Sequence, residues 1–387
     1  MSYREEWKEY ILTDVIDTFL DYRGKTPKKT KSGIPLITAK VVKNGRILEA
    51  KEFIAIDNYI PWMRRGLPKY GDVVLTVEAP LGQVGQILTY DKIALSQRII
   101  TLRGKENIVN NTFLKYSLQD REMQNRLKAR ATGTTVIGIK SSELKKINIP
   151  LPLLETQNRI ASILSAFDEK IEVNRQMNAT LEAMAQAMFR EMCLPKDEKN
   201  LEEGWEWRTL KDDFKLNMGQ SPKGSTYNED GEGMIFFQGK RDFGKRFPTI
   251  RVYTTEPKRI AETGDCLLSV RAPVGTLNIA LEKCCIGRGL AAISHKKGYN
   301  SFCFYTLQNF EQQFISYDGE GTVFGSINKR TLGNLKYAKP SDKVLKAFEA
   351  LVKPIDEQIR NQTLENQNLV KTRDLLLPKL MNGEIEV

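Results

Sequence analysis

The chain of 387 residues contains one sequence unit written twice. Its repeated blocks share motifs such as Gly-Asp, an aliphatic run, Ala-Pro and a final Gly. A repeat of this kind must be recognised before a fold is assigned, and it predicts two similar halves, each with a long segment followed by a short one. Three blocks recur in the same order, displaced by 187 to 193 residues: 71–82 with 264–275, 135–138 with 322–325, and 167–171 with 355–359.

The long segments are predicted to be mixed α/β domains. Residues 72–77 and 266–270 are β-branched and aliphatic runs opened by Gly-Asp and closed by Ala-Pro, which is typical of a strand followed by a turn. The Gly- and Thr-rich stretches 133–138 and 319–325 are predicted to be exposed loops. Short helices are expected before these loops, at 111–131 and 302–314.

The short segments are predicted to be long helices that pair with each other in antiparallel orientation. A helix of about 35 residues is about 50 Å long, too long to pack against one small domain throughout. We expect Met184 and Met188 to lie in the helix–helix core, and Pro354 predicts that the second helix is kinked or begins there. Apolar residues recur at steps of three and four, with Asn174 as an interruption: Ile160, Ile163, Phe167, Ile171, Met177, Leu181, Met184 and Met188.

Positive charge is concentrated in the two long segments. Residues 1–150 carry 26 basic and 16 acidic side chains, whereas residues 151–200 carry 6 and 8. Residues 201–340 carry 20 and 16, and residues 341–387 carry 7 and 8. A polyanion that contacts the long segments explains this distribution, and two such domains on a helical frame could touch duplex patches about 34 Å apart. A basic chain kept in solution by its charge is the simpler alternative.

Catalytic motifs are largely missing from the sequence. The one histidine, His295, is expected to be a surface residue, and most imidazole-based schemes are excluded. Residues 239–246 resemble a phosphate-binding loop, but Arg246 stands where that loop needs a hydroxyl. There is no Pro-Pro for an amino-methyltransferase motif, and the acidic pair at 197–198 has the wrong spacing for a nuclease. The five cysteines form no Cys-x-x-Cys pair, and with no apolar run of about 18 residues we expect a soluble, reduced, cytoplasmic protein without a membrane partner or a bound metal.

Candidate DNA contacts are cations and short hydroxyl-bearing loops, since Lys and Arg bind phosphates and Arg also binds guanine. Arg98 and Arg288 are predicted to occupy corresponding places in the two copies. The candidates in the first copy are Lys25, Lys28, Lys29, Lys31, Lys40, Lys43, Arg46, Arg64, Arg65, Arg98, Thr134, Thr135 and Lys140. Those in the second are Lys223, Lys240, Arg241, Lys245, Arg246, Arg251, Arg271, Arg288, Thr322, Asn328 and Lys329.

The whole chain resembles the specificity subunit of a type I DNA restriction–modification system. The resemblance rests on Ile-Pro-Leu-Pro-Leu-Leu-Glu-Thr-Gln at 149–157 and on Leu-Leu-Pro-Lys-Leu-Met-Asn-Gly-Glu-Ile at 376–385, together with the paired Gly-Asp and Ala-Pro motifs. The second copy departs from the pattern at 338–341, where Ala-Lys-Pro-Ser replaces Ile-Pro-Leu-Pro, so the start of the second helix is less sharply marked.

The resemblance implies an α+β fold with two target-recognition domains, two long antiparallel coiled-coil spacer helices and an internal pseudo-two-fold duplication. Its expected parts are residues 1–152, 153–194, 195–342 and 343–387. Each recognition domain would read one half of a bipartite, asymmetric site in double-stranded DNA, and the helices would set the gap. The chain would have no catalytic residue or cofactor of its own. Two modification (methyltransferase) subunits would dock on the apolar, Met-rich helix faces. Restriction (motor-nuclease) subunits would join them, and these partner subunits would supply the S-adenosylmethionine, ATP and Mg chemistry.

Two alternatives remain at this point. The chain could be a self-sufficient DNA methyltransferase or nuclease with a diverged site, which a methylation assay on the isolated chain would reveal. It could also be a coiled-coil scaffold with two basic domains, which would show no sequence preference in a footprint.

Overall fold

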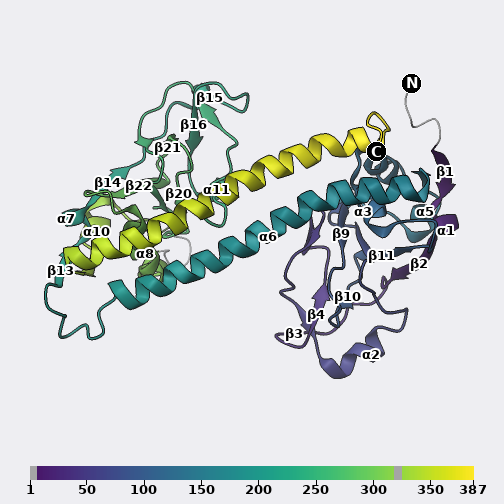
Figure 1. Ribbon diagram of the computed structural model, residues 1–387, viewed down its shortest axis with the longest axis horizontal. Helices are drawn as coiled ribbons and strands as arrows, with labels where there is room; N and C mark the ends of the chain where they lie inside the picture. Colours follow the sequence, from purple (N-terminus) through teal and green to yellow (C-terminus); the bar gives the residue numbers. More distant parts are fainter. Residues whose placement is uncertain (1–6, 318–324) are drawn as a thin grey trace. The chain divides into compact units, whose positions relative to one another are not determined.

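The computed structural model describes residues 7–317 and 325–387. The chain folds into two compact units, one containing Met1–Val173 with Asn366–Val387 and the other containing Asn174–Glu365. Two helices of 40 residues, α6 (Leu154–Cys193) and α11 (Asp342–Met381), each contribute one part to each unit (Figure 1).

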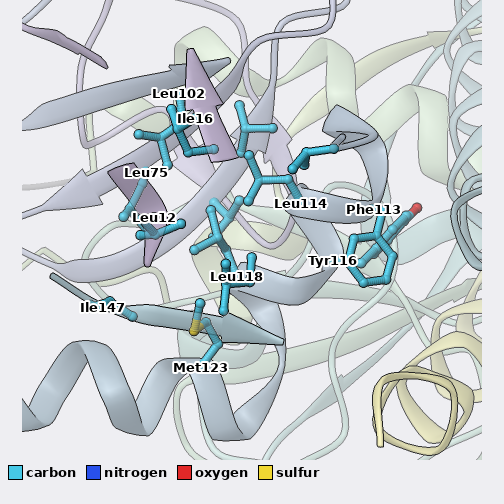
Figure 2. Close-up of a cluster of buried hydrophobic side chains, with 14 of the residues drawn as sticks. Leu12, Ile16, Leu75, Leu102, Phe113, Leu114, Tyr116, Leu118, Met123 and Ile147 are labelled. Carbon is cyan, nitrogen blue, oxygen red and sulfur yellow. The ribbon is translucent and has the colours of Figure 1, made fainter. Parts of the chain in front are cut away.

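The first unit is organised around an antiparallel sheet with the order β2-β11-β8-β9. Helices α3 (Asn111–Gln119) and α4 (Arg121–Ala129) follow it, with Asn110 capping α3 through its side chain. Figure 2 shows Leu114 and Leu118 of α3 on the side of Leu75 and Leu102 of the sheet, with the buried Tyr116 hydroxyl pointing away from these leucines. The strands are β2 (Ile16–Asp21), β8 (Val73–Val77), β9 (Leu81–Gln86) and β11 (Ile99–Gly104), and strand β1 (Lys8–Ile11) pairs with β12 (Asn148–Leu151).

A second, smaller sheet of the first unit has the order β10-β4-β7-β3 and its own apolar core. Leu36, Ile54 and Leu95 of this sheet are buried together with Tyr59 of the short helix α2 (Tyr59–Trp62). Its strands are β3 (Lys29–Thr30), β4 (Ile34–Ile37), β7 (Phe53–Ile54) and β10 (Ala94–Leu95). A separate two-stranded sheet consists of β5 (Val42–Lys43) and β6 (Arg46–Ile47). The remaining helices are α1 (Leu12–Val15) and α5 (Ser141–Leu144).

The second unit repeats this arrangement with different sequence. Its main sheet has the order β14-β22-β19-β20 and is followed by α8 (Asn300–Asn309) and α9 (Glu311–Ile315). Its smaller sheet has the order β15-β17-β16-β21-β18, and β13 pairs with β23. The strands are β13 (Glu206–Thr209), β14 (Phe214–Met218), β15 (Tyr227–Asn228), β16 (Met234–Phe237), β17 (Tyr253–Thr254), β18 (Ile260–Ala261), β19 (Cys266–Ser269), β20 (Leu277–Ile279), β21 (Cys284–Ile286), β22 (Leu290–His295) and β23 (Lys336–Lys339). Short helices α7 (Leu210–Asp213) and α10 (Lys329–Gly333) complete it.

The repeated Ala-Pro turn is held by the same hydroxyl in both units. The Thr76 hydroxyl donates to the carbonyl of Pro80 at 2.6 Å and accepts from the amide of Gln83 at 2.9 Å. Ser269 makes the same pair of bonds with Pro273 and Thr276, at 2.8 and 2.9 Å. The duplication seen in the sequence is therefore a duplication of local hydrogen bonding as well as of motif.

In each unit the parts of α6 and α11 pack antiparallel, which confirms the predicted pairing. In the first unit Leu164 lies in one apolar cluster with Leu377, and Asp168 pairs with Arg373 at 2.5 Å, so residue numbers rise along α6 as they fall along α11. In the second unit Asn174 donates to Glu365 at 2.8 Å, and further along α6 Phe189 packs edge-on against Phe348 of α11. The polar pairs fix register because each requires one partner at one height.

The predicted set of core positions on α6 is partly wrong. Ile163, Met177 and Met184 are exposed, whereas Leu164 and Ala185 are fully buried. Apolar residues at steps of three and four can lie on either of two neighbouring faces of a helix, so the spacing alone does not identify the buried face. The prediction also favoured long apolar side chains over small ones such as Ala185. Pro354 does not begin the second helix, because α11 starts at Asp342 and continues through Pro354.

Candidate nucleic-acid interface

In the first unit, three segments far apart in sequence meet at the end of β8. The Val77 amide donates to the carbonyl of Arg98 at 3.0 Å, and the Val77 carbonyl accepts from the amide of Ile139 at 3.0 Å. Glu78 forms an isolated antiparallel bridge with Gly138. The Ala-Pro turn, Arg98 and the Gly/Thr loop at 133–138 are therefore neighbours.

The second unit joins the corresponding segments in the same way. The Val270 amide donates to the carbonyl of Gly289 at 2.9 Å, and its carbonyl accepts from Ile327 at 3.0 Å. Arg271 forms an isolated bridge with Ser326. We name the two arrangements the turn–loop junctions: residues 77–79, 98 and 133–140 in the first unit, and residues 270–272, 289 and 325–329 in the second.

The predicted equivalence of Arg98 and Arg288 is wrong by one residue. Ile99 pairs with Thr76 in the first unit, whereas Leu290 pairs with Ser269 in the second. Arg98 therefore corresponds to Gly289, and Arg288 occupies the position before it. The sequence alone shows an Arg near each strand start, but only the pairing register identifies equivalent positions.

Arg23 is a cation at the first junction that the sequence analysis does not single out, although it lies two residues before Lys25. It pairs with Asp21 at 2.6 Å and donates Nη1 to the carbonyl of Ile139 at 2.9 Å. Burial raises the pKa of Asp21, but the hydrogen bonds and charge of Arg23 outweigh that effect and keep it below its ordinary value. Arg65 in turn donates to the carbonyl of Arg23 at 3.1 Å, so its guanidinium is held against the backbone of Arg23.

The predicted contacts Arg98, Thr134, Thr135 and Lys140 are all exposed at this first junction. Arg98 lies 3.4 Å from Glu78, and half of its side chain remains accessible. The paired carboxylate is itself exposed, so the pair is weak and can exchange for a phosphate. This junction brings together four of the predicted contacts from two segments of the chain.

At the second junction Arg271, Asn328 and Lys329 are exposed. The Asn328 side chain accepts from the amide of Thr331 at 2.9 Å and caps α10. Arg288, also exposed, is positioned beside the junction by its amide, which donates to the Ser221 hydroxyl at 3.1 Å. The predicted contact Thr322 lies outside the described residues.

A second set of predicted cations lies on the smaller sheets and their loops, away from the junctions in sequence. Lys29 and Lys40 share Glu52, at 2.9 and 3.7 Å. In the second unit Arg251 pairs with Asp242 and Glu229. The exposed members of this set are Lys25, Lys28, Lys29, Lys31, Lys40, Lys43, Arg64, Lys223, Lys240, Arg241 and Lys245.

Arg246 is not a surface cation, which contradicts the prediction that it contacts DNA. Its side chain is 4% exposed, pairs with Asp356 at 2.5 Å and stacks 4.5 Å from the Phe304 ring centroid. A guanidinium held in this way binds a helix rather than a phosphate. Arg46 is also engaged, since it pairs with Glu172 of α6, although part of its side chain stays accessible.

The repeated Asp of α6 and α11 binds helix α3 in the first unit and helix α8 in the second. In the first unit Asp168 accepts from Lys115 at 2.6 Å, from the Tyr116 hydroxyl at 2.7 Å and from Arg373 at 2.5 Å. Burial raises the pKa of Asp168. The charge of Lys115 and the hydrogen bonds from Lys115, Tyr116 and Arg373 outweigh this effect, so the pKa of Asp168 lies below its ordinary value. In the second unit Asp356 accepts from Tyr305 at 3.2 Å, beside Arg246.

His295 is buried, so the prediction that it is a surface residue is wrong. Its side chain packs edge-on against Phe214 and Phe302, and its Nδ1 accepts from the amide of Lys297 at 3.1 Å. Burial lowers the pKa of His295 to about 4. The two neighbouring lysines misled the prediction, because β22 ends at His295 and both lysines follow that end.

Other groups suited to chemistry are dispersed. All five cysteines are buried thiols. Across residues 7–317 and 325–387, no three His, Cys, Asp or Glu side chains are grouped to hold a metal ion. Within those same ranges, no helix has the length and apolar character needed to cross a membrane.

Comparison with known proteins gives one consistent family. A family model described as type I restriction modification DNA specificity domain matches residues 4–183 and 202–366. The sequence is 31% identical to the MjaX type I restriction enzyme specificity subunit of Methanocaldococcus jannaschii, over 99% of this chain and 94% of that protein. It is 28% identical to the MjaIX specificity subunit of the same organism, over 84% and 79%. The solved S subunit of a type I restriction–modification system from M. genitalium has the same fold, with 18% identity, a TM-score of 0.64 and coverage of 97% and 96%.

Proposed function

Because the chain belongs to the type I restriction–modification DNA specificity family, we propose that it is the DNA-recognition subunit of such a system. Each unit's recognition segment reads one half of a bipartite site. The two halves of the site differ because the two segments differ in sequence. The chain itself carries no catalytic residue in this proposal.

The observation that carries the proposal is the occurrence of one turn–loop junction in each unit. Val77 and Val270 join the same three segments, and exposed cations lie at both. A repeated arrangement with repeated positive charge fits a duplex, whose phosphates present the same chemistry at two places.

The DNA contacts proposed are the exposed members of the predicted set, with Arg23 added. Arg246 is excluded because it is buried against Asp356. Lys and Arg residues of the smaller sheets and of the junctions supply phosphate contacts, which position the protein on the duplex. The proposed set is Arg23, Lys25, Lys28, Lys29, Lys31, Lys40, Lys43, Arg64, Arg65, Arg98, Thr134, Thr135, Lys140, Lys223, Lys240, Arg241, Lys245, Arg271, Arg288, Asn328 and Lys329.

In the proposed assembly, α6 and α11 set the gap between the two half-sites and dock two modification subunits. Exposed apolar residues on α6, among them Ile163, Val173, Met177 and Met184, offer contact area for such partners. The modification subunits would bring S-adenosylmethionine, and restriction subunits would bring ATP and Mg chemistry. The parts proposed for these roles are residues 1–152 and 195–342 for recognition and 153–194 and 343–387 for spacing, in a cytoplasmic complex.

The proposal is tested by mapping methylated adenines in DNA from cells that carry this chain and its modification subunits. We expect one bipartite sequence with one methylated adenine in each half. Exchange of residues 1–150 for another recognition segment should change one half only. Methylation scattered without a sequence preference would refute a recognition role, and methyl transfer by the isolated chain would favour the self-sufficient enzyme instead.

A further inference from the structure

Two adjacent aliphatic side chains project from the loop of the first junction. Val136 is 49% exposed and Ile137 is 56% exposed. Scattered apolar residues on a protein surface need no explanation, but a consecutive pair at the end of a loop is a small apolar patch. The pair does not belong to the unit's own core, which takes from this stretch Ile139, two residues after Ile137.

Backbone hydrogen bonds hold the loop that carries these two side chains. Thr132 and Gly138 exchange both backbone hydrogen bonds, at 2.8 and 3.0 Å, which closes residues 132–138 into a short hairpin. Gly133 has a φ of +117°, and a Cβ there would lie 2.1 Å from the carbonyl oxygen of Val136. Ile139 then anchors the end of the hairpin to β8 through Val77. Val136 and Ile137 are therefore exposed residues of a hairpin whose backbone is fixed at both ends.

The base of this hairpin carries cations, whereas its end carries Val136 and Ile137 beside Thr134 and Thr135. Arg23 is bonded to the carbonyl of Ile139, Arg98 lies beside Glu78, which bridges Gly138, and Lys140 is exposed next to the anchor. Cations at this level would meet phosphates, and the groups that project beyond them would reach into a groove. Phosphates and water do not attract aliphatic groups, whereas base edges and thymine methyl groups do.

We propose that Val136 and Ile137 enter a groove of the first half-site and contact bases, so that they contribute to specificity and not to phosphate binding. This inference rests on the proposed DNA-recognition function and assigns an apolar part to a surface described so far by its charge. It distinguishes the two residues from their neighbours Thr134, Thr135 and Lys140, whose polar groups suit the backbone.

The test uses the complex of the full chain with its modification subunits and a duplex that carries the mapped site. The variant is Val136→Ser with Ile137→Ser, and the matched control is Leu88→Ser, an exposed leucine of the same unit outside the junction. Affinity is measured over a range of salt for the cognate duplex and for one with the first half-site scrambled. Loss of base contacts worth one or two base pairs predicts about a 10- to 100-fold loss on the cognate duplex. The scrambled duplex and the salt dependence should not change, because no phosphate contact is removed.

Three results would overturn the inference. They are unchanged cognate affinity, an equal loss on both duplexes, and a shallower salt dependence, the last two of which indicate a backbone contact or a distorted unit. The conservative pair Val136→Ile with Ile137→Val should keep most of the cognate affinity, because both side chains stay aliphatic. If the complex with the unsubstituted chain shows no preference for the cognate duplex, the proposed function is wrong. That outcome is distinct from failure of the role given to Val136 and Ile137.

Discussion

The hydroxyl of Tyr116 donates a hydrogen bond of 2.7 Å to Asp168, linking helix α3 of the recognition segment to helix α6. In the second unit Asp356 accepts from Tyr305 at 3.2 Å. The cation beside Asp356 is Arg246, which does not belong to the helix that carries Tyr305. The Asp-Glu repeat seen in the sequence is therefore a pair of anchoring carboxylates. We expect the orientation of each recognition segment on its helices to depend on them.

Asp168→Asn should destabilise the first unit by about 3 kcal/mol, because Lys115 would remain buried without its counter-charge. Chemical denaturation of the full chain measures this change. The control is Glu169→Gln on the exposed side of the same helix, for which we expect a change under about 0.5 kcal/mol. Equal stability of the two variants would show that the buried pair is unimportant.

Stability of the second unit should fall as the pH drops from about 6.5 towards 4, in part because of His295. Its pKa in the folded protein is about 4, below the ordinary value of about 6.5, so the unfolded chain binds the proton more readily in this range. His295→Asn removes the titrating group while an amide oxygen can still accept from Lys297. Unfolding free energies measured between about pH 7 and pH 5 should fall less steeply in the variant than in the parent. Parallel pH profiles would argue against a neutral, buried imidazole.

Arg98→Gln and Lys140→Gln should weaken binding to all duplexes, since phosphate contacts carry little sequence information. Each lost contact should reduce the slope of log affinity against log salt by about 0.9. Lys92→Gln, at another exposed lysine of the same unit, serves as the control and should leave the slope unchanged. A loss restricted to the cognate duplex would instead make Arg98 or Lys140 a base-reading residue.

Insertion of one heptad into both long helices should lengthen the gap between the methylated half-sites. Seven residues add about 10 Å of helix, which corresponds to about three base pairs. The insertions belong after Val173 in α6 and after Glu365 in α11, where the two compact units divide, so that the Asp168–Arg373 and Asn174–Glu365 pairs are each preserved. Adenine mapping then reports the gap, and an unchanged gap would contradict the spacer role. Insertion into one helix alone should disrupt assembly, because it shifts the register of every pair beyond it.

Much of the fold follows from local sequence patterns. The recurrence of Gly-Asp and Ala-Pro predicted both sheets' central strands, and apolar periodicity predicted two long helices that pair antiparallel, as α6 and α11 do. The core positions on α6 were less predictable. Leu164 and Ile163 are equally apolar, and which of them faces α11 depends on the rotation of the helix, to which Asp168 and its partners contribute.

The candidate interface shows the same division. Sequence alone identified Arg98 and Lys140 as cationic candidates and the Gly/Thr loop as exposed, since charge and turn residues are local properties. It could not separate Arg246 from the neighbouring Lys245, because burial against Asp356 arises from a helix 110 residues away in the chain. Nor could it identify Arg23, whose role depends on a bond to Ile139 across 116 residues.

The amino-acid sequence by itself determined the duplication, the alternation of long and short segments and the placement of positive charge, because repetition, periodicity and charge are written along the chain. Only the tertiary structure decided which cations are surface groups, which valine joins the Ala-Pro turn to the distant loop, and that His295 is buried. Those outcomes depend on hydrogen bonds and packing between residues remote in sequence, and the free energy of such contacts has no counterpart in local pattern.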